Sequence, residues 1–411
     1  MKKITDNYTW PLMRDTVTKQ DRKKASNFIL NSSRLTQGKE VAKFEKQWNE
    51  WLGSKHSLFV SSGSAANLLL VSAWKELHDI PDYSKVIVPA CTWVTNVSPI
   101  IQCNLEPIFC DINLDDFSFD IERLKKLRNR YGNDIRAIFV THLLGYPAET
   151  NKFKEIFPDV HILEDVCESH GAVLSNGNKA GTYDVGGTFS FYFGHHMTTI
   201  EGGMVSTNDS ELYDLMRMKR SHGLARESTK FEAYKKKYRD VDPQFLFVTE
   251  GYNFRNTDLS AIIGQSQLER LDEMIDIRNE NYEYYYELVT KHSIMFVPPT
   301  NKPGISSFCF PLVSRDRVFH ARLKKLLKEY HVEYRPIVSG NLLRQPFLAQ
   351  YSAECVNADI AHERGLYIGN NHFVNKENFE ILDEILTQVR MEKMHWPDGT
   401  PEIPEIPNHE H

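Results

Sequence analysis

The stretch from Ser57 to Leu77 reads SLFVSSGSAANLLLVSAWKEL and joins a short apolar run to a helix-length segment through a turn of small residues. The run at 57–60 has the length and composition of a buried strand, whereas the apolar spacing of residues 65–77 suits a helix. Similar pairs recur between about residue 57 and residue 207, and the further apolar runs begin at Lys85, Arg136 and Val160. This alternation predicts an α/β fold with a mostly parallel central sheet covered by helices on both faces.

A region with a different composition begins near residue 298. Before it, residues 259–292 keep helical apolar spacing and predict one long helix or a helix pair. Pro298-Pro299 then opens a segment for which we expect a strand at 307–313, a basic amphipathic helix at 318–330 and further helices to about residue 392. These elements predict a smaller α+β domain.

The domain boundaries follow from this change of composition. We expect a large domain over residues 1–270 and a small C-terminal domain over residues 271–395. Residues 396–411 include repeated Pro-Glu-Ile units, which predict a disordered tail.

The overall charge and composition restrict the class of partner. The 411-residue chain has a formal net charge of −6 and no long basic run, so nucleic acid is not the expected partner, although a local pocket can still bind an anionic small molecule. No segment is apolar over the ~18 residues that a membrane span needs, and the basic start MKKITDN leads into no apolar signal segment. The six cysteines are scattered without a CxxC pair, which is typical of a reduced, cytoplasmic protein.

Two strand ends carry residues suited to binding a planar, phosphorylated ligand. The small residues of the segment 61–67, SSGSAAN, allow close approach of an anion to the first turn of a helix. The alternative is an ordinary helix cap. Trp93, in the segment PACTWVTN at 89–96, could stack on a planar ring. Its alternative is a core tryptophan.

A third candidate lies at the end of the apolar strand in ILEDVCESHGA, residues 162–172. Asp165 would be costly to bury there without a partner. A protonated pyridinium nitrogen is one such partner, because the carboxylate keeps that nitrogen charged and the ring then withdraws electrons. A helix N-cap is the alternative role for this aspartate.

The fourth candidate is the pair His195-His196 in GTFSFYFGHHMTTIEGGMVS, residues 187–206. A single histidine is commonly a surface residue or a core residue with its hydrogen bonds satisfied. A metal site is not expected, because neighbours on an extended chain point to opposite faces and no third ligand is close in the sequence.

The four segments, in this order and spacing, resemble the DegT/DnrJ/EryC1/StrS family of nucleotide-sugar aminotransferases. A later stretch, GYNFRNTDLSAIIG at 251–264, matches another signature of that family. The resemblance covers roughly residues 20–390 and implies the type I aminotransferase fold.

The chain departs from the family pattern at the position of the Schiff-base lysine. Alignment on Glu201-Gly202-Gly203 places that lysine at His195 and the following asparagine at His196, and Ile200 replaces a glycine. Without the lysine, the chain lacks the amine that would attach the cofactor and carry its proton.

The resemblance implies a set of residues around pyridoxal 5'-phosphate and its amine form, pyridoxamine 5'-phosphate. The implied cofactor-binding residues are Gly63, Ser64, Trp93, Asp165, Glu168, Ser190 and Asn253. Asn253 or Arg255 would reach the cofactor phosphate of the neighbouring subunit in a homodimer. The candidates for binding the carboxylate of L-glutamate or the diphosphate of a nucleotide sugar are Arg220, His222, Arg226 and Arg255.

A His-His pair at this place resembles the sugar 3-dehydratase branch, of the GDP-4-keto-6-deoxy-D-mannose 3-dehydratase type. The implied reaction removes the 3-hydroxyl of a nucleotide-linked 4-keto-6-deoxyhexose for 3,6-dideoxysugar and O-antigen synthesis, with L-glutamate regenerating the amine cofactor and His195 as acid and base. An iron–sulfur CDP-sugar 3-dehydrase is not expected, because residues 204–308 contain no cysteine to hold a cluster. The alternatives are a residual aminotransferase and an inactive sugar-binding homologue.

Overall fold

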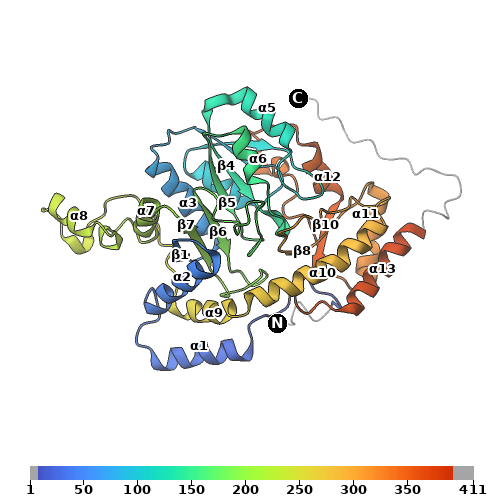
Figure 1. Cartoon of the computed structure of the whole chain (residues 1–411), viewed down its shortest axis with the longest axis horizontal. Helices are drawn as coiled ribbons and strands as arrows, with labels where there is room; N and C mark the ends of the chain where they lie inside the picture. The colour runs from blue at the N-terminus through green and yellow to red at the C-terminus, as the bar shows by residue number, and fades with distance from the viewer. Residues whose placement is uncertain (1–7, 392–411) are drawn as a thin grey trace.

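Two sheets organise the computed structural model, which describes residues 8–391 (Figure 1). The larger sheet has seven strands in the order β1-β7-β6-β5-β4-β2-β3. Its strands are β1 (His56–Val60), β2 (Lys85–Pro89), β3 (Glu106–Cys110), β4 (Ile135–Thr141), β5 (His161–Asp165), β6 (Gly186–Ser190) and β7 (Gly203–Thr207). The strands predicted at 57–60, 85–89, 136–140 and 160–163 correspond to β1, β2, β4 and β5.

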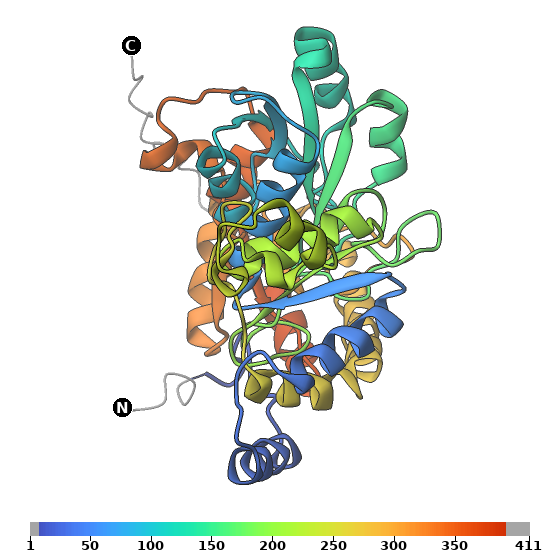
Figure 2. The ribbon, with the colours of Figure 1, turned by 90° about the vertical axis from the view of Figure 1, so that its left-hand side faces the viewer.

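The large sheet is parallel except at β7, which runs antiparallel to both β1 and β6. The prediction of a mostly parallel sheet is therefore confirmed. Alternate residues of β1 face different helices: Leu58 and Val60 belong to a core cluster with residues of α3 (Gly63–Leu77) and α7 (Ser210–Arg220). Phe59, between them, packs in another cluster with residues of α2 (Lys39–Leu52). Helices thus cover both faces, as Figure 2 shows.

Several of the remaining helices also pack on the sheets: Leu124 and Phe153, for example, lie in one core cluster with Ile138 of β4. The predicted pair at 259–292 consists of α9 (Asp258–Leu268) and the long α10 (Leu271–Lys291). The other helices of the described residues are α1 (Lys19–Asn31), α4 (Ser98–Gln102), α5 (Ile121–Tyr131), α6 (Thr150–Ile156), α8 (Phe231–Lys237), α11 (Arg317–Glu329), α12 (Val356–Arg364) and α13 (Lys376–Met391). None of the described helices is both long enough and apolar enough to cross a membrane.

The smaller sheet is antiparallel and follows α10 in the sequence. Its order is β8-β10-β9, with β8 at Cys309–Val313, β9 at Tyr334–Pro336 and β10 at Gly365–Gly369. A smaller α+β part at the C-terminal end is therefore confirmed, whereas the domain boundary at residue 270 stays a prediction. The predicted disordered tail at 396–411 lies outside the described residues.

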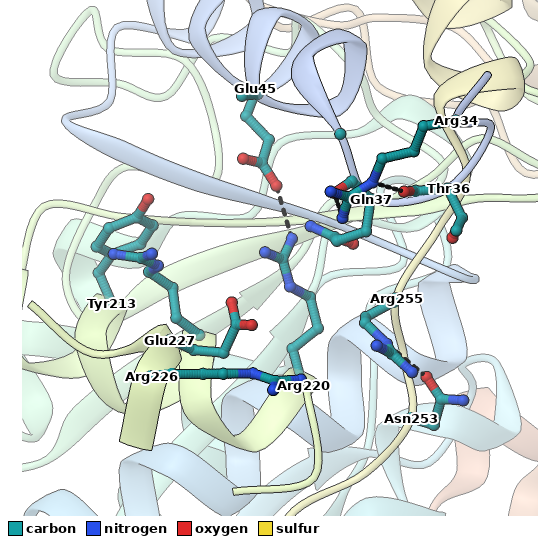
Figure 3. Close-up of a pocket in the computed structure, with 13 residues that line it drawn as sticks. Arg34, Thr36, Gln37, Glu45, Tyr213, Arg220, Arg226, Glu227, Asn253 and Arg255 are labelled. Atoms are coloured by element: carbon teal, nitrogen blue, oxygen red, sulfur yellow. Dashed lines mark hydrogen bonds and ion pairs between the residues drawn. The ribbon is translucent and has the colours of Figure 1, made fainter. Parts of the chain in front are cut away.

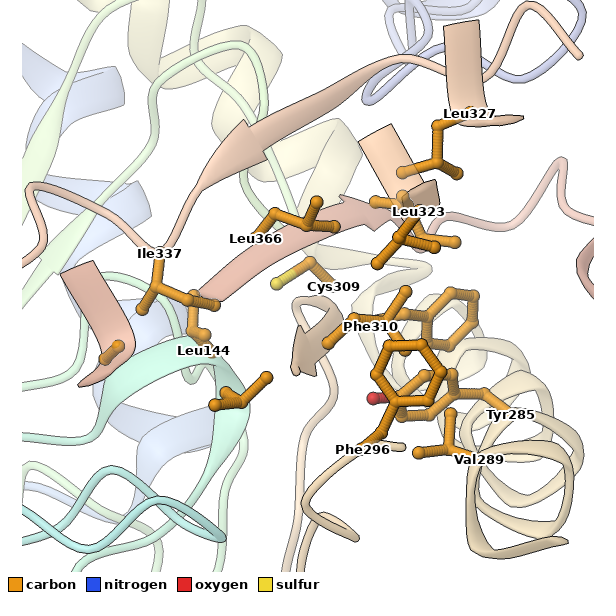
Figure 4. Packing of buried hydrophobic residues seen from close by; sticks show 14 of the residues in the cluster. Leu144, Tyr285, Val289, Phe296, Cys309, Phe310, Leu323, Leu327, Ile337 and Leu366 are labelled. Atoms are coloured by element: carbon orange, nitrogen blue, oxygen red, sulfur yellow. The ribbon is translucent and has the colours of Figure 1, made fainter. Parts of the chain in front are cut away.

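A hydrophobic core joins the two parts of the chain (Figure 4). Leu144, from the loop after β4, belongs to the same cluster as Cys309 and Phe310 of β8 and Tyr285 of α10. The segment 306–308 also pairs with this loop, since the N–H groups of Ser306 and Phe308 donate to the carbonyls of Gly145 and Leu144. The small sheet is thus packed directly against the end of the large one.

Asp21 attaches α1 to the start of α10. Its side chain is fully buried and receives both terminal nitrogens of Arg270, at 3.1 and 2.7 Å, and the Thr18 N–H at 2.8 Å. Burial alone would raise the pKa of Asp21, but the hydrogen bonds from Arg270 and its other partners outweigh burial and hold the pKa at about 2.

We expect Asp21→Asn to lower the free energy of unfolding by about 2 kcal/mol at pH 7, because the folded state prefers the charged carboxylate. A depressed pKa gives stability that is present above the unfolded value, near 4, and is lost as the pH falls towards 2. Urea unfolding at pH 7 and at pH 3 measures both parts, and the gap between mutant and wild type should narrow at pH 3. Equal midpoints at pH 7 would contradict the prediction.

Candidate functional site

The candidate residues gather at one edge of the large sheet. Asp165 ends β5 and Ser190 ends β6, which are parallel neighbours, and Gly63 begins the helix that follows β1. Because the carboxyl ends of parallel strands meet at one edge, these three positions come together. A Cβ atom on Gly63 would lie 2.7 Å from the Ser190 Cβ and 2.9 Å from the Cys167 Sγ, so only glycine fits there.

The first turn of α3 is open to an anion. The Ser62 side chain caps the helix by accepting the Ala65 N–H at 3.0 Å, and the helix continues for 15 residues. The cap that was considered as an alternative role is therefore present, but it belongs to Ser62. Gly63 and Ser64 remain in the first turn beside Ser190, where backbone N–H groups and the helix dipole favour a phosphate.

Asp165 is held by residues that the sequence analysis did not single out. One of its carboxylate oxygens accepts from the Asn67 side chain at 2.8 Å and the other from the Cys167 N–H at 2.9 Å. Burial raises the pKa of Asp165, and these hydrogen bonds oppose the rise. Asn67 also donates to the Thr95 carbonyl and accepts from Thr188, so one amide connects α3, β6 and the turn that carries Trp93.

Glu164 takes a separate, structural role on the opposite face of β5. It is completely buried, lies 3.0 Å from the ring of His142 and accepts the N–H groups of Gly181 and Tyr183. Adjacent residues of a strand point to opposite faces, which separates Glu164 from Asp165. The N-cap role considered for Asp165 is wrong, because none of the described helices begins directly after it. The backbone N–H that it accepts belongs to Cys167, in the turn after β5.

Trp93 is exposed by 52%, so the core alternative considered for it is wrong. It precedes a short 3-10 turn, Val94–Asn96, which Asn67 holds through Thr95. Its indole is therefore free to stack on a ligand at the edge of the sheet.

Glu168 lies on the loop after β5, next to Asp165 in space and sequence. Burial, together with the charge of Asp165, raises the pKa of Glu168 to about 7, although the Leu144 N–H, which donates at 3.0 Å, opposes the rise. Glu168 therefore exchanges a proton near neutral pH and can either donate or accept a hydrogen bond.

His195 lies in a turn after β6, with its N–H donated to the Tyr192 carbonyl. Its ring packs against Phe308, with ring centroids 5.4 Å apart, and against His170 at 6.1 Å. Its Nδ1 is buried and has no hydrogen-bond partner among the described residues. Burial, with a smaller contribution from the charge of Arg278, lowers the pKa of His195 to about 4, although the Cys167 backbone opposes the shift. The imidazole is thus uncharged at neutral pH and has one nitrogen available.

His196 is fully buried and engaged. Its Nε2 lies 3.2 Å from both the carbonyl and the hydroxyl of Ser306, and its Nδ1 lies 3.3 Å from the Nδ1 of His170. The two neighbouring histidines do not point to opposite faces, as an extended chain would require, because residues 194–197 form a turn. Both rings contact Phe308 and His170.

A third histidine, His170, lies beside the pair, and its position could not be predicted from the sequence. Even so, no group of three or more His, Cys, Asp or Glu side chains between residues 8 and 391 is arranged to hold a metal ion.

An arginine-rich hollow of about 700 Å³ lies near β1, between residues of α2, α7 and the segment 253–255 (Figure 3). Its charged and amide lining includes Arg34, Glu45, Arg217, Arg220, Arg226, Glu227, Asn253 and Arg255. It adjoins the start of α3, because Arg255 pairs with Val60 and the Ser61 N–H donates to the Phe254 carbonyl.

The residues predicted to bind a ligand here differ in burial and in the hydrogen bonds that they already make within the chain. Arg220 is buried, and its guanidinium donates to Glu45 at 2.6 Å and to the Phe59 carbonyl at 3.0 Å, so it supports the wall. Arg255 donates to the Asn253 side chain at 3.0 Å and lies 3.2 Å from the His222 Nε2, so these three predicted residues are brought together. Arg226 donates to the Gln244 carbonyl at 3.1 Å, and its side chain is exposed, so a ligand can reach it.

Comparison with known proteins identifies the family of the chain. A sequence model of the DegT/DnrJ/EryC1/StrS aminotransferase family matches residues 16–386. GDP-4-keto-6-deoxy-D-mannose 3-dehydratase of Yersinia pseudotuberculosis is 35% identical over 401 residues, which cover 94% of this chain and all of that protein. GDP-perosamine synthase of Vibrio cholerae is 29% identical over 277 residues, covering 67% of this chain and 69% of the relative.

A solved structure is similar over most of its length. It is that of a GDP-4-keto-6-deoxymannose-3-dehydratase with a trapped PLP-glutamate geminal diamine, with a TM-score of 0.83 and 31% identity. The match covers 92% of this chain and all of that one.

Proposed function

The chain belongs to the DegT/DnrJ/EryC1/StrS aminotransferase family, and on this basis we propose that it is a pyridoxal-phosphate-dependent sugar 3-dehydratase. Its substrate would be a nucleotide-linked 4-keto-6-deoxyhexose, of the GDP-4-keto-6-deoxymannose kind, and L-glutamate would renew the amine form of the cofactor. The observation that carries the proposal is His195: an uncharged imidazole with a free buried nitrogen stands at the position that the family pattern gives to lysine.

The residues present fit pyridoxal phosphate. Gly63 leaves a cradle beside Ser190 that any side chain would fill, and Trp93 offers an exposed aromatic face. Asp165 is a buried carboxylate suited to a protonated ring nitrogen, and Glu168 can bond a ring hydroxyl. When bound, the cofactor would supply a ring that withdraws electrons from the carbon beside the reacting nitrogen.

His195 would move the proton at that carbon. An imidazole that is uncharged at pH 7 can accept a proton without first losing one, and it can return the proton in the glutamate half-reaction. Unlike a lysine, it has no primary amine and cannot form a Schiff base, so it would not recapture the cofactor covalently, and the product could leave and lose ammonia by hydrolysis. Phe308 packs against one side of the imidazole ring and would help to keep water from the proton.

The arginine-rich hollow would take the diphosphate of the nucleotide sugar. Arg226 and Arg255 both line this hollow, and a guanidinium binds phosphate through paired hydrogen bonds (Figure 3). We also propose a homodimer, in which Asn253 would contact the cofactor of the partner subunit. In support, the arm with α8 stands away from the sheets in Figure 1, and the exposed Phe245 and Phe247 follow it.

The proposed reaction differs from transamination in where the nitrogen of L-glutamate ends up. Removal of the 3-hydroxyl with L-glutamate as the source of electrons yields a 4-keto-3,6-dideoxy sugar, 2-oxoglutarate and ammonia in equal amounts. A transaminase would retain the nitrogen in an amino sugar and release no ammonia.

We expect the protein, incubated with pyridoxal phosphate, L-glutamate and a panel of GDP-, CDP- and dTDP-linked 4-keto-6-deoxy sugars, to release ammonia and 2-oxoglutarate in equal amounts. The sugar product, identified by mass spectrometry, should have lost one oxygen and contain no amino group. An amino sugar formed without ammonia would make the protein an aminotransferase. Cofactor binding without turnover of any sugar in the panel would favour an inactive binding protein.

A further inference from the structure

Arg278 is a buried cation at the centre of the contact between α10 and the small sheet. Its side chain is 3% exposed, and its Nη1 donates to the Phe308 carbonyl at 3.0 Å and to the carbonyl of Asn370. The Asn370 side chain returns two hydrogen bonds at 2.9 Å, to the Arg278 carbonyl and to the Ser307 hydroxyl. One arginine thus fixes the segment before β8 to the segment after β10.

The segment that Arg278 fixes is the one that encloses the histidines. Phe308 packs its ring against His195 at 5.4 Å and against His196 at 6.0 Å, and the Ser306 carbonyl lies 3.2 Å from the His196 Nε2. From the other side, the loop at 144–145 holds Ser306 and Phe308 through backbone hydrogen bonds. Arg278 therefore acts on His195 through Phe308 and not by direct contact.

The charge of Arg278 is not neutralised by a neighbouring carboxylate. Its contacts between residues 8 and 391 are to carbonyl oxygens, no ion pair within 4.0 Å joins it to a described acid, and its Nε has no hydrogen-bond partner there. Burial lowers the pKa of Arg278 to about 10, so it is still charged at neutral pH. A buried cation without a counter-ion is costly and opposes any further positive charge nearby.

We propose that Arg278 is a positioning residue that holds Phe308 against His195 and, as a buried cation, adds to the effect of burial in disfavouring a proton on that imidazole. The inference rests on the proposed function, in which His195 must be uncharged to accept a proton. It gives a role to a buried arginine that is not among the residues proposed to bind the cofactor or the sugar.

The other groups near His195 do not supply the positive charge that Arg278 provides. His196 in the same turn and His170 from the loop after β5 are both buried, and burial lowers the pKa of each. That loop also carries the carboxyl groups of Asp165 and Glu168, and Tyr192 lies beside the ring, at 6.2 Å. From the strand side, the segment before β8 contributes Phe308, which has no charge. Arg278 of α10 is the cation that acts on all three histidines.

The test measures the pKa of His195 directly in the cofactor-free protein. Histidine labelled with carbon-13 is followed by NMR as the pH is changed, and the signal of His195 is assigned by its absence in His195→Asn. Arg278→Met should raise the pKa of His195 by about one unit, the low end of the shift that a nearby charge produces. Arg278→Lys keeps the charge and should leave that pKa low. Lys291→Met, which removes an exposed cation from the same helix, should leave the pKa of His195 unchanged.

The same variants separate this inference from the proposed function. If the protein dehydrates no sugar, the titration still reports whether Arg278 controls His195. In an active enzyme, the acid limb of kcat against pH should move upward with Arg278→Met and return with Arg278→Lys. Arg278→Gln replaces the Met variant if that fails to fold. An unchanged His195 titration in a folded Met or Gln variant overturns the inference, as does an equal rise with Arg278→Lys.

Discussion

Replacing His195 with asparagine should reduce kcat by about 10²–10⁴-fold, the usual cost of losing a general base, while pyridoxal phosphate and the sugar still bind. Asparagine has a similar size and can keep contact with Phe308, but it cannot accept and return a proton. Both half-reactions should slow, because one proton carrier serves both. Single-turnover measurements with L-glutamate alone, and then with the sugar, show the two effects separately.

The neighbouring histidine provides the control. His196 is buried against Ser306 and His170, so His196→Asn should lower stability and reduce kcat much less than His195→Asn. His195→Lys should change the absorption spectrum of the bound cofactor, because an amine then stands beside it, and should divert or stop dehydration. If His196→Asn lost activity while His195→Asn kept it, the assignment would be wrong by one residue.

Trp48→Ala should lower the free energy of unfolding by about 3–5 kcal/mol, the cost typical of removing a large buried aromatic side chain. Trp48 of α2 is completely buried, with its ring 4.9 Å from Phe189, 5.0 Å from Phe191 and 6.0 Å from His170. Its indole N–H donates to the Ser206 hydroxyl at 3.2 Å. Trp48 therefore packs against β6, the strand that leads into the His195 turn.

Urea unfolding of the purified protein measures this loss. Trp48→Phe keeps most of the packing but loses the hydrogen bond to Ser206. It should lower the free energy of unfolding by about 1 kcal/mol for that bond and by a smaller amount for the lost packing. A Trp48→Ala variant as stable as wild type would mean that α2 contributes little to the fold.

The sequence predicts the strands whose apolar runs are local, and it misses what depends on distant contacts. Strands β1, β2, β4 and β5 stand where the apolar runs predict them, because burial on both faces leaves a continuous apolar signal. Asp165 could be located from the end of such a run. Its partner Asn67 could not be identified, since the bond spans 98 positions of the chain.

The histidine turn shows a different limit. The assumption of an extended chain predicted that His195 and His196 diverge, whereas a turn brings both against His170 and Phe308. Arg278 gave no local signal, because a single arginine in a polar helix is ordinarily exposed. Its burial arises only once the small sheet packs on α10.

The contact between Phe308 and His195 also has a consequence for how the protein is made. Every strand of the large sheet, and His195 itself, leaves the ribosome before the segment 306–308 has been synthesised. A nascent chain can therefore form its sheet while the imidazole lacks one wall. A chain that stops short of this segment would retain Gly63, Asp165 and Ser190 but leave His195 open to water. Catalytic competence would thus arrive late in translation, after the last of the sheet strands.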